Sequence, residues 1–156
     1  CSSDLMKTFI GQEHFFDSLL PHEMTHVIFR EFVGVNTVLP LWIDEGVASS
    51  QEKSNLNIRM QIAKDLVIKN RDIGLNELSE VVNFDKGTVI TPDIFYAQSA
   101  SLLVFLIREE GKDRFLEFSR SLRDGIDWKS ALLSAYHFAT LEELEKEWKN
   151  FMLKYK

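Results

Sequence analysis

The spacing of apolar residues along the chain predicts helices. In and just after the segment 21–31, Met24, Val27, Ile28 and Phe32 recur at intervals of three, one and four residues. These intervals place the four side chains on one stripe of an amphipathic helix. The same kind of pattern predicts further helices at 40–52, 58–69, 75–81, 92–110, 112–122 and 128–136, and a last one that begins at 140.

Local signals indicate where several of these helices begin and end. Pro21 fits only in the first turn of its helix, because proline lacks an N–H and its ring disrupts an interior position. Gly111 is suited to cap the C-terminal end of the helix before it. Thr140 and Glu143 have the spacing of a capping box, in which a hydroxyl and a carboxylate bind the free N–H groups of the first turn.

Two segments break the helical pattern. Residues 34–40 and 84–92 combine β-branched residues with Gly or Pro, so each is predicted to be a loop, with room for one short strand, at 88–91 in the second. With little else that suggests sheet, the chain is expected to be mainly α. At 156 residues it is long enough for one domain with a real core.

Composition and charge narrow the classes of function. The hydrophobic share of 45% and the charged share of 27% are those of an ordinary globular protein. A net charge of −6, with no basic face, argues against nucleic-acid binding. No apolar run is long enough for a transmembrane segment. Cys1 is the only cysteine, which excludes an intrachain disulfide; it could be a lipid-anchored start or the point where a fragment begins. The sequence assigns no compartment.

The segment His22-Glu23-Met24-Thr25-His26 carries the first chemical signal. Residues four apart on a helix share one face, so both imidazoles can bind one cation, and neutral imidazole is a good zinc ligand. Glu23 lies about 100° round the helix from His22, where a carboxylate can act as a base on water beside the metal. A shuffled chain of this composition contains the motif roughly once in a hundred, and two surface histidines remain the alternative.

A second motif follows eighteen residues after His26. The segment Leu41-Trp42-Ile43-Asp44-Glu45-Gly46 contains W-x-x-E-G, and the pair of motifs resembles the gluzincin metallopeptidases, most closely their aminopeptidase-N-like branch. The resemblance implies a zincin-like catalytic domain with a C-terminal helical bundle. It implies that His22, His26 and Glu45 bind one Zn²⁺ per chain and that Glu23 is the general base. Zinc itself is not selected by affinity alone.

Glu52 matches a recurrent acidic position of these enzymes, seven residues after Glu45. It lies two turns along the same predicted helix, and we expect it to orient a ligand histidine without binding the metal itself. Asp44 has two interpretations: a hydrogen bond to a ligand imidazole, or, favoured two to one, capping or solvation of its helix. His14 and His137 have no partner at ligand spacing, so surface roles are favoured.

The resemblance extends to the segment that begins at Tyr96 and to the last helix, so it covers roughly residues 19–153. Tyr96 is the candidate for a phenol donor to the oxyanion of peptide hydrolysis, with an interfacial aromatic as the equal alternative. The expected substrate is a peptide or protein. The upstream G-x-M-E-N segment of the aminopeptidases has no counterpart here, so the chain is expected to be either a catalytic fragment or a reduced enzyme.

Two other functions remain as alternatives. One is a zinc-bound but inactive peptidase-like domain that serves as a binding or scaffold module, although the retained Glu23 argues against it. The other is a helical interaction domain without metal, which leaves both motifs unexplained. The oligomeric state is not indicated by the sequence.

Overall fold

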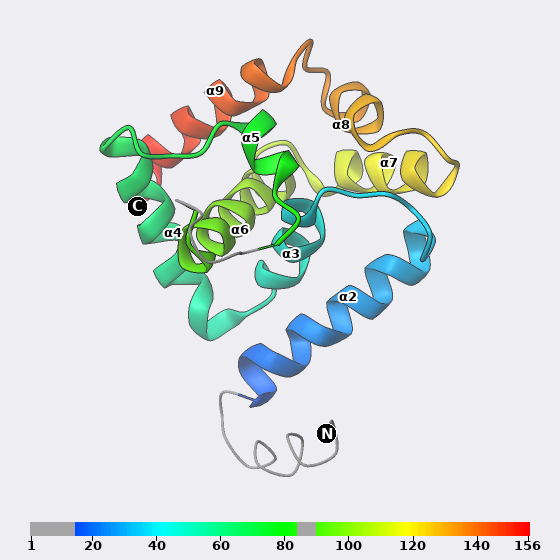
Figure 1. Cartoon of the computed structure of the whole chain (residues 1–156), viewed down its shortest axis with the longest axis horizontal. Coiled ribbons are helices and arrows are strands. Elements are labelled where there is room, and N and C mark those ends of the chain that lie inside the picture. The colour runs from blue at the N-terminus through cyan, green and yellow to red at the C-terminus, as the bar shows by residue number, and fades with distance from the viewer. Residues whose placement is uncertain (1–14, 84–89) are drawn as a thin grey trace.

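The computed structural model of the chain describes residues 15–83 and 90–156, and these residues form helices joined by loops (Figure 1). Within these ranges there is no strand, so the prediction of a mainly α fold is confirmed. The elements are the π-helical turn η1 (Phe15–Leu19) and the α-helices α2 (Leu20–Val33), α3 (Leu41–Ser49), α4 (Lys53–Ile68), α5 (Leu75–Glu80), α6 (Pro92–Arg108), α7 (Lys112–Arg123), α8 (Trp128–Tyr136) and α9 (Leu141–Lys154).

Helix α6 forms the centre of the hydrophobic core. Every residue from Ala97 to Leu106 is buried, and α3, α4, α7 and α9 pack around this helix (Figure 1). A helix that is buried on all sides is mostly apolar all round, and the buried run of α6 fits this except at Gln98, Ser99 and Ser101. Its buried Gln98 exchanges two hydrogen bonds with the main chain of Ile73, which ties the α4–α5 connection to the core.

Gly46 lets α3 approach α6 closely. A Cβ atom at this position would lie 2.6 Å from Cδ2 of Leu103 and 2.7 Å from the main-chain oxygen of Ser99. Only glycine fits such a backbone approach without a shift of one helix. The glycine of the W-x-x-E-G motif therefore places Glu45, its neighbour, against the centre of the fold.

Helix α2 packs against α3 and α7 but extends away from the rest of the fold (Figure 1). Its predicted apolar stripe faces outward: Met24, Val27, Ile28 and Phe32 are 51%, 69%, 63% and 39% exposed. The buried apolar residues of this helix are Phe29 and Val33, on the same face as the two histidines. The face that carries His22 and His26 is turned inward, so the adjacent apolar stripe is left at the surface.

The helix predicted at 40–52 is shorter than expected. It ends at Ser49, and Glu52 becomes the N-cap residue of α4, with φ −79° and ψ 90°. The next helix therefore begins at Lys53 rather than at 58. The prediction that Glu52 continues the helix of Glu45 is wrong, and its side chain reaches the site by another route, described below.

The remaining signals at helix ends have mixed outcomes. Pro21 lies in the first turn of α2, as predicted, and is preceded by the π-helical turn. Thr140 Oγ1 accepts a hydrogen bond from the N–H of Glu143, while Glu143 accepts one from Ala139, so the capping function is confirmed. Gly111 has φ +100° but serves as the N-cap of α7, because α6 already ends at Arg108.

Residues 34–40 form a loop without a strand. Half of the strand considered at 88–91 lies outside the described residues, and its described half, Ile90 and Thr91, is not in a strand. Trp42 and Trp148 are fully buried, and each donates its indole N–H to a serine hydroxyl. None of the helices in the described ranges has the length and apolarity needed to cross a bilayer.

Candidate metal centre

Three potential ligand atoms from α2 and α3 converge on one point. Nε2 of His22 lies 3.1 Å from Nε2 of His26, and Oε2 of Glu45 lies 3.5 Å and 3.6 Å from these two nitrogens. Zinc bonds to imidazole nitrogen and carboxylate oxygen of about 2.0–2.2 Å, at tetrahedral angles, separate ligand atoms by about 3.3–3.6 Å. The two distances from Glu45 lie in this range and the 3.1 Å between the imidazole nitrogens falls slightly below it, so the three atoms are close enough together to share one cation.

The local sequence explains this convergence. His22 and His26 are four residues apart on α2, so their rings project from one face of the helix. Glu45 lies in the middle of α3, which is packed against that face of α2. All three side chains are partly buried, with exposed fractions of 16–22%. The site is therefore held by packed helices while it keeps access to solvent.

Glu52 binds the ring of His22 on its Nδ1 side. Oε1 of Glu52 accepts a hydrogen bond from Nδ1 of His22 at 2.7 Å, which leaves Nε2 of that ring for the cation. Glu52 is itself buried and receives further hydrogen bonds from Asn55 at 2.8 Å and from Arg59 at 2.9 Å. The role predicted for Glu52 is thus compatible with the structure, although its position on a continuous helix was wrong.

Asp44 lies beside Nδ1 of His26 as an ion-pair partner, at a longer distance than the hydrogen bond between Glu52 and His22. Oδ1 of Asp44 lies 3.3 Å from Nδ1 of His26, while Oδ2 accepts hydrogen bonds from Nε and Nη2 of Arg30 at 3.1 and 2.9 Å. Arg30 also donates to the main-chain oxygen of Thr37. The hydrogen bond from a ligand imidazole to Asp44, the less favoured interpretation, stays a prediction: Oδ1 lies near Nδ1 of His26 but makes no hydrogen bond within the described residues.

The carboxylates of the cluster raise the pKa of both histidines. Glu45 and Glu52 raise the pKa of His22 to about 9, and Asp44 and Glu45 raise the pKa of His26 to about 10. Burial alone would raise the pKa of Glu45, but the two histidines outweigh it and bring the value to about 2. The metal-free pocket therefore attracts positive charge, which a divalent cation can supply in place of protons.

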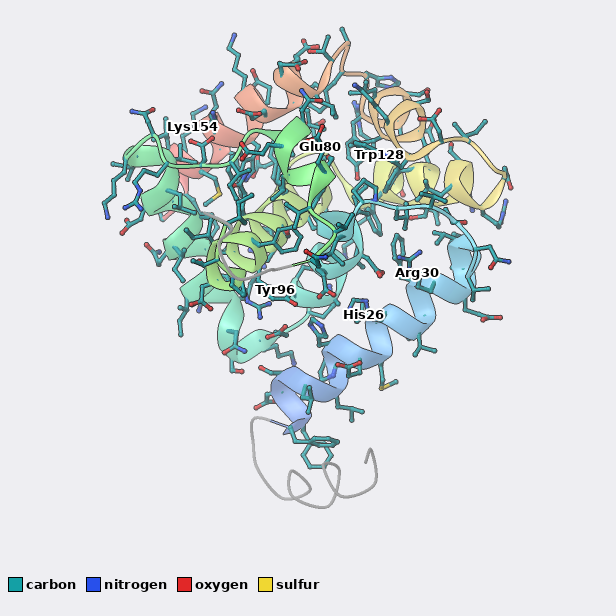
Figure 2. All side chains as sticks on the ribbon, in the orientation of Figure 1. His26, Arg30, Glu80, Tyr96, Trp128 and Lys154 are labelled. Atoms are coloured by element: carbon teal, nitrogen blue, oxygen red, sulfur yellow. The ribbon has the colours of Figure 1, made fainter. Side chains whose placement is uncertain are left out.

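Glu23 and Tyr96 lie at the edges of this cluster. Glu23 follows His22 on α2 and is exposed, so its carboxylate is open to solvent. Tyr96 is half-buried near the start of α6; burial first, and then the negative charge of Glu45, raise its pKa. Figure 2 labels Tyr96 on α6 and His26 on α2, and α3 packs against both helices.

Sequence reasoning missed the two arginines. Arg30 lies four residues after His26, so helical spacing alone could have placed it on the face of the two histidines. Arg59 had no such signal, because Glu52 was assigned to the preceding helix. Of the other histidines, His137 is exposed and ends α8 with φ +60°, which agrees with a surface role, and His14 lies outside the described residues.

The comparison with protein families gave a match over most of the chain. A sequence model described as the Peptidase MA superfamily matches residues 15–154, nearly the whole chain. The mainly α fold agrees with a helical zincin-like domain of that family. Searches of curated proteins and of solved structures gave no significant match.

Proposed function

Because the chain belongs to the Peptidase MA superfamily, we propose that it hydrolyses peptide bonds with one zinc ion held by His22, His26 and Glu45. The observation that carries the proposal is the convergence of their three ligand atoms within 3.1–3.6 Å of one another. Peptidases of this superfamily typically depend on a metal, and these residues are the cluster of the described chain that could hold one.

The donor set favours zinc in a catalytic role. Two imidazole nitrogens and one carboxylate oxygen are a usual catalytic zinc set, in which one position stays free for water or substrate. When bound, zinc would act as a Lewis acid that lowers the pKa of water toward neutrality and polarises a peptide carbonyl. The partial exposure of the three ligands agrees with access for a substrate.

The other residues have separate tasks in this proposal. Glu23 takes a proton from the attacking water on its carboxylate and passes that proton to the departing amine. Glu52 and Asp44 fix the Nδ1 sides of His22 and His26, so that Nε2 of each ring faces the ligand cluster. The hydroxyl of Tyr96 donates a hydrogen bond to the oxyanion that develops on the carbonyl.

Within the superfamily, the proposed relatives are the gluzincins, because the two motifs are eighteen residues apart and the second contains W-x-x-E-G. The substrate class is a peptide or protein.

Metal content and hydrolysis test the proposal together. Elemental analysis should find about one zinc per chain, as expected for a single four-coordinate site. His26→Ala should lose the zinc, whereas the exposed His137→Ala should keep it. Hydrolysis of casein or a peptide library should accompany zinc, and Glu23→Gln should keep the metal but lose hydrolysis.

Each negative result would favour a different alternative. Zinc binding with no hydrolysis of any peptide would indicate an inactive scaffold. Absence of zinc after reconstitution would mean that the cluster is not a zinc site, and a metal-free interaction domain would then be the better interpretation. Full activity of Glu23→Gln would exclude Glu23 as the base.

A further inference from the structure

Arg59 contacts two groups that the proposed mechanism uses separately. Its Nη1 donates to Oε1 of Glu52 at 2.9 Å, the same oxygen that receives the Nδ1–H of His22. The centre of its guanidinium lies 5.6 Å from the centre of the Tyr96 ring, over the ring face. One side chain on α4 therefore connects a residue behind the ligand cluster with the proposed oxyanion donor on α6.

We propose that Arg59 is a positioning residue that fixes the Glu52 carboxylate against His22 and, with the same guanidinium, holds the ring of Tyr96 beside the metal centre. The proposal rests on the zinc site proposed above. It adds a residue that acts through Glu52 and Tyr96, and it assigns to Arg59 no contact with metal or substrate.

The contact between Arg59 and Glu52 matters because a buried charge is costly without a partner. The side chain of Glu52 is 7% exposed, and a buried carboxylate needs a partner of opposite charge. An imidazole bound to zinc is itself neutral, and the cation would act on Glu52 only from across the ring of His22. The guanidinium is always charged. Arg59 is thus the partner that keeps Glu52 an acceptor for the Nδ1–H of His22 while the metal is bound.

The contact between Arg59 and Tyr96 holds the ring because a cation over an aromatic face is attracted to it. A guanidinium within about 6 Å of a ring centre attracts the ring electrons and, being planar, restricts the tilt of the ring. Arg59 also opposes the rise in the pKa of Tyr96 that burial and the charge of Glu45 cause. A positive charge near the phenol makes its O–H a stronger hydrogen-bond donor.

Zinc affinity is the first test, because it does not depend on peptidase activity. Competition with a chelating dye should show that Arg59→Gln binds zinc about ten-fold more weakly, the lower end of the effect of groups that orient metal ligands. The matched control is Arg114→Gln, because Arg114 is a partly buried arginine that bonds the main chain of Tyr136 and pairs with Glu110, away from the site. It should bind zinc as tightly as the unmodified chain.

A double variant separates positioning from general stabilisation. If Arg59 acts on the metal through Glu52, adding Arg59→Gln to Glu52→Gln should weaken zinc binding no further. Arg59→Lys should restore most of the affinity, because an ammonium can still pair with Glu52. It should leave kcat at saturating zinc reduced, because a compact ammonium does not cover a ring face as a planar guanidinium does.

The outcomes distinguish this inference from the proposed function. If the unmodified chain binds zinc and Arg59→Gln binds it equally well, Arg59 has no positioning role and the zinc site stands. Equal losses in Arg59→Gln and Arg114→Gln, or full kcat in Arg59→Lys, would also overturn the inference. A chain that binds no zinc in any form would overturn both. Circular dichroism of each variant, with Arg59→Lys as the milder change, shows whether the fold is retained.

Discussion

Asp44 faces His26 with one carboxylate oxygen, 3.3 Å from the ring Nδ1, while its other oxygen is bound by Arg30. His22 has a closer carboxylate partner: its Nδ1 is hydrogen-bonded to Glu52 at 2.7 Å, and Arg59 donates to the same oxygen of Glu52. Each candidate ligand histidine therefore has a carboxylate on the Nδ1 side of its ring, and each of these carboxylates is bound by an arginine. The arrangement fixes both rings with Nε2 toward Glu45 before any cation binds, so little reorganisation is needed on binding.

Replacement of Asp44 by asparagine should weaken zinc binding by about ten-fold, because the imidazole of His26 loses its charged partner while the volume of the side chain is kept. Competition with a chelator measures this effect. The control is Asp65→Asn, which removes an exposed pairing of Asp65 with Lys69; such surface pairs contribute little. Unchanged zinc affinity in Asp44→Asn would show that Asp44 holds Arg30 and the loop 34–40 in place and does not support the metal centre.

Tyr96→Phe tests the proposed oxyanion donor. The variant should keep its zinc, since the hydroxyl is not a ligand, but its kcat should fall by about 10²–10³-fold, the usual effect of losing one such donor. KM should change little. Tyr155→Phe, at the end of α9, provides a control remote from the cluster. Unchanged turnover in Tyr96→Phe would leave Tyr96 as an interfacial aromatic residue, the alternative interpretation of the sequence.

The parts of the site that depend on one helix were predictable from sequence. His22 and His26 share a face because they are one helical turn apart. Helical periodicity within a single segment also predicted α8 at its observed bounds. Glu45 is on another helix, and its assignment depended on the resemblance carried by the second motif. The structure brings these three residues together, as that assignment requires.

The parts that depend on tertiary contacts were not predictable. The segment around Ser50 and Glu52 has no Gly or Pro to indicate the break between α3 and α4. The break is stabilised by the bond of Glu52 to His22, which is distant in sequence, and by its bond to Arg59 two turns into α4. Likewise, apolar spacing in α2 predicted a stripe through Met24 and Ile28. It could not show that the histidine face would be the buried one.

Gly46→Ala should destabilise the fold, because the new methyl would lie 2.7 Å from the main-chain oxygen of Ser99 and force α3 away from α6. The expected loss is about 1–3 kcal/mol, typical of overpacking a core, or several degrees in Tm for a chain of this size. Gly74→Ala is the control: its Cβ would lie 3.7 Å from Glu145, an ordinary contact. If both variants melt alike, the close α3–α6 approach is not the reason for Gly46.

The zinc-free protein should lose stability on both sides of a mildly acidic optimum. The pKa of His22 rises from 6.5 to about 9 and that of His26 to about 10 on folding. Their contribution to stability is fully present below pH 6.5 and is lost as the pH rises through these folded values. The pKa of Glu45 and of Glu52 falls from 4.5 to about 2. Their contribution is present above pH 4.5 and is lost as the pH falls toward 2.

The optimum of the zinc-free protein therefore lies between the unfolded pKa values, 4.5 for the carboxyl groups and 6.5 for the histidines. Thermal unfolding in the presence of a chelator, from about pH 5 to about pH 10, should show Tm falling on the alkaline side. His22→Gln should flatten that fall, because it removes one of the groups that titrate. Excess zinc should reverse the trend near neutrality, since the cation binds the deprotonated imidazoles. A Tm of the zinc-free protein that rises from neutral to alkaline pH would mean that the two histidines are not held as cations against these carboxylates.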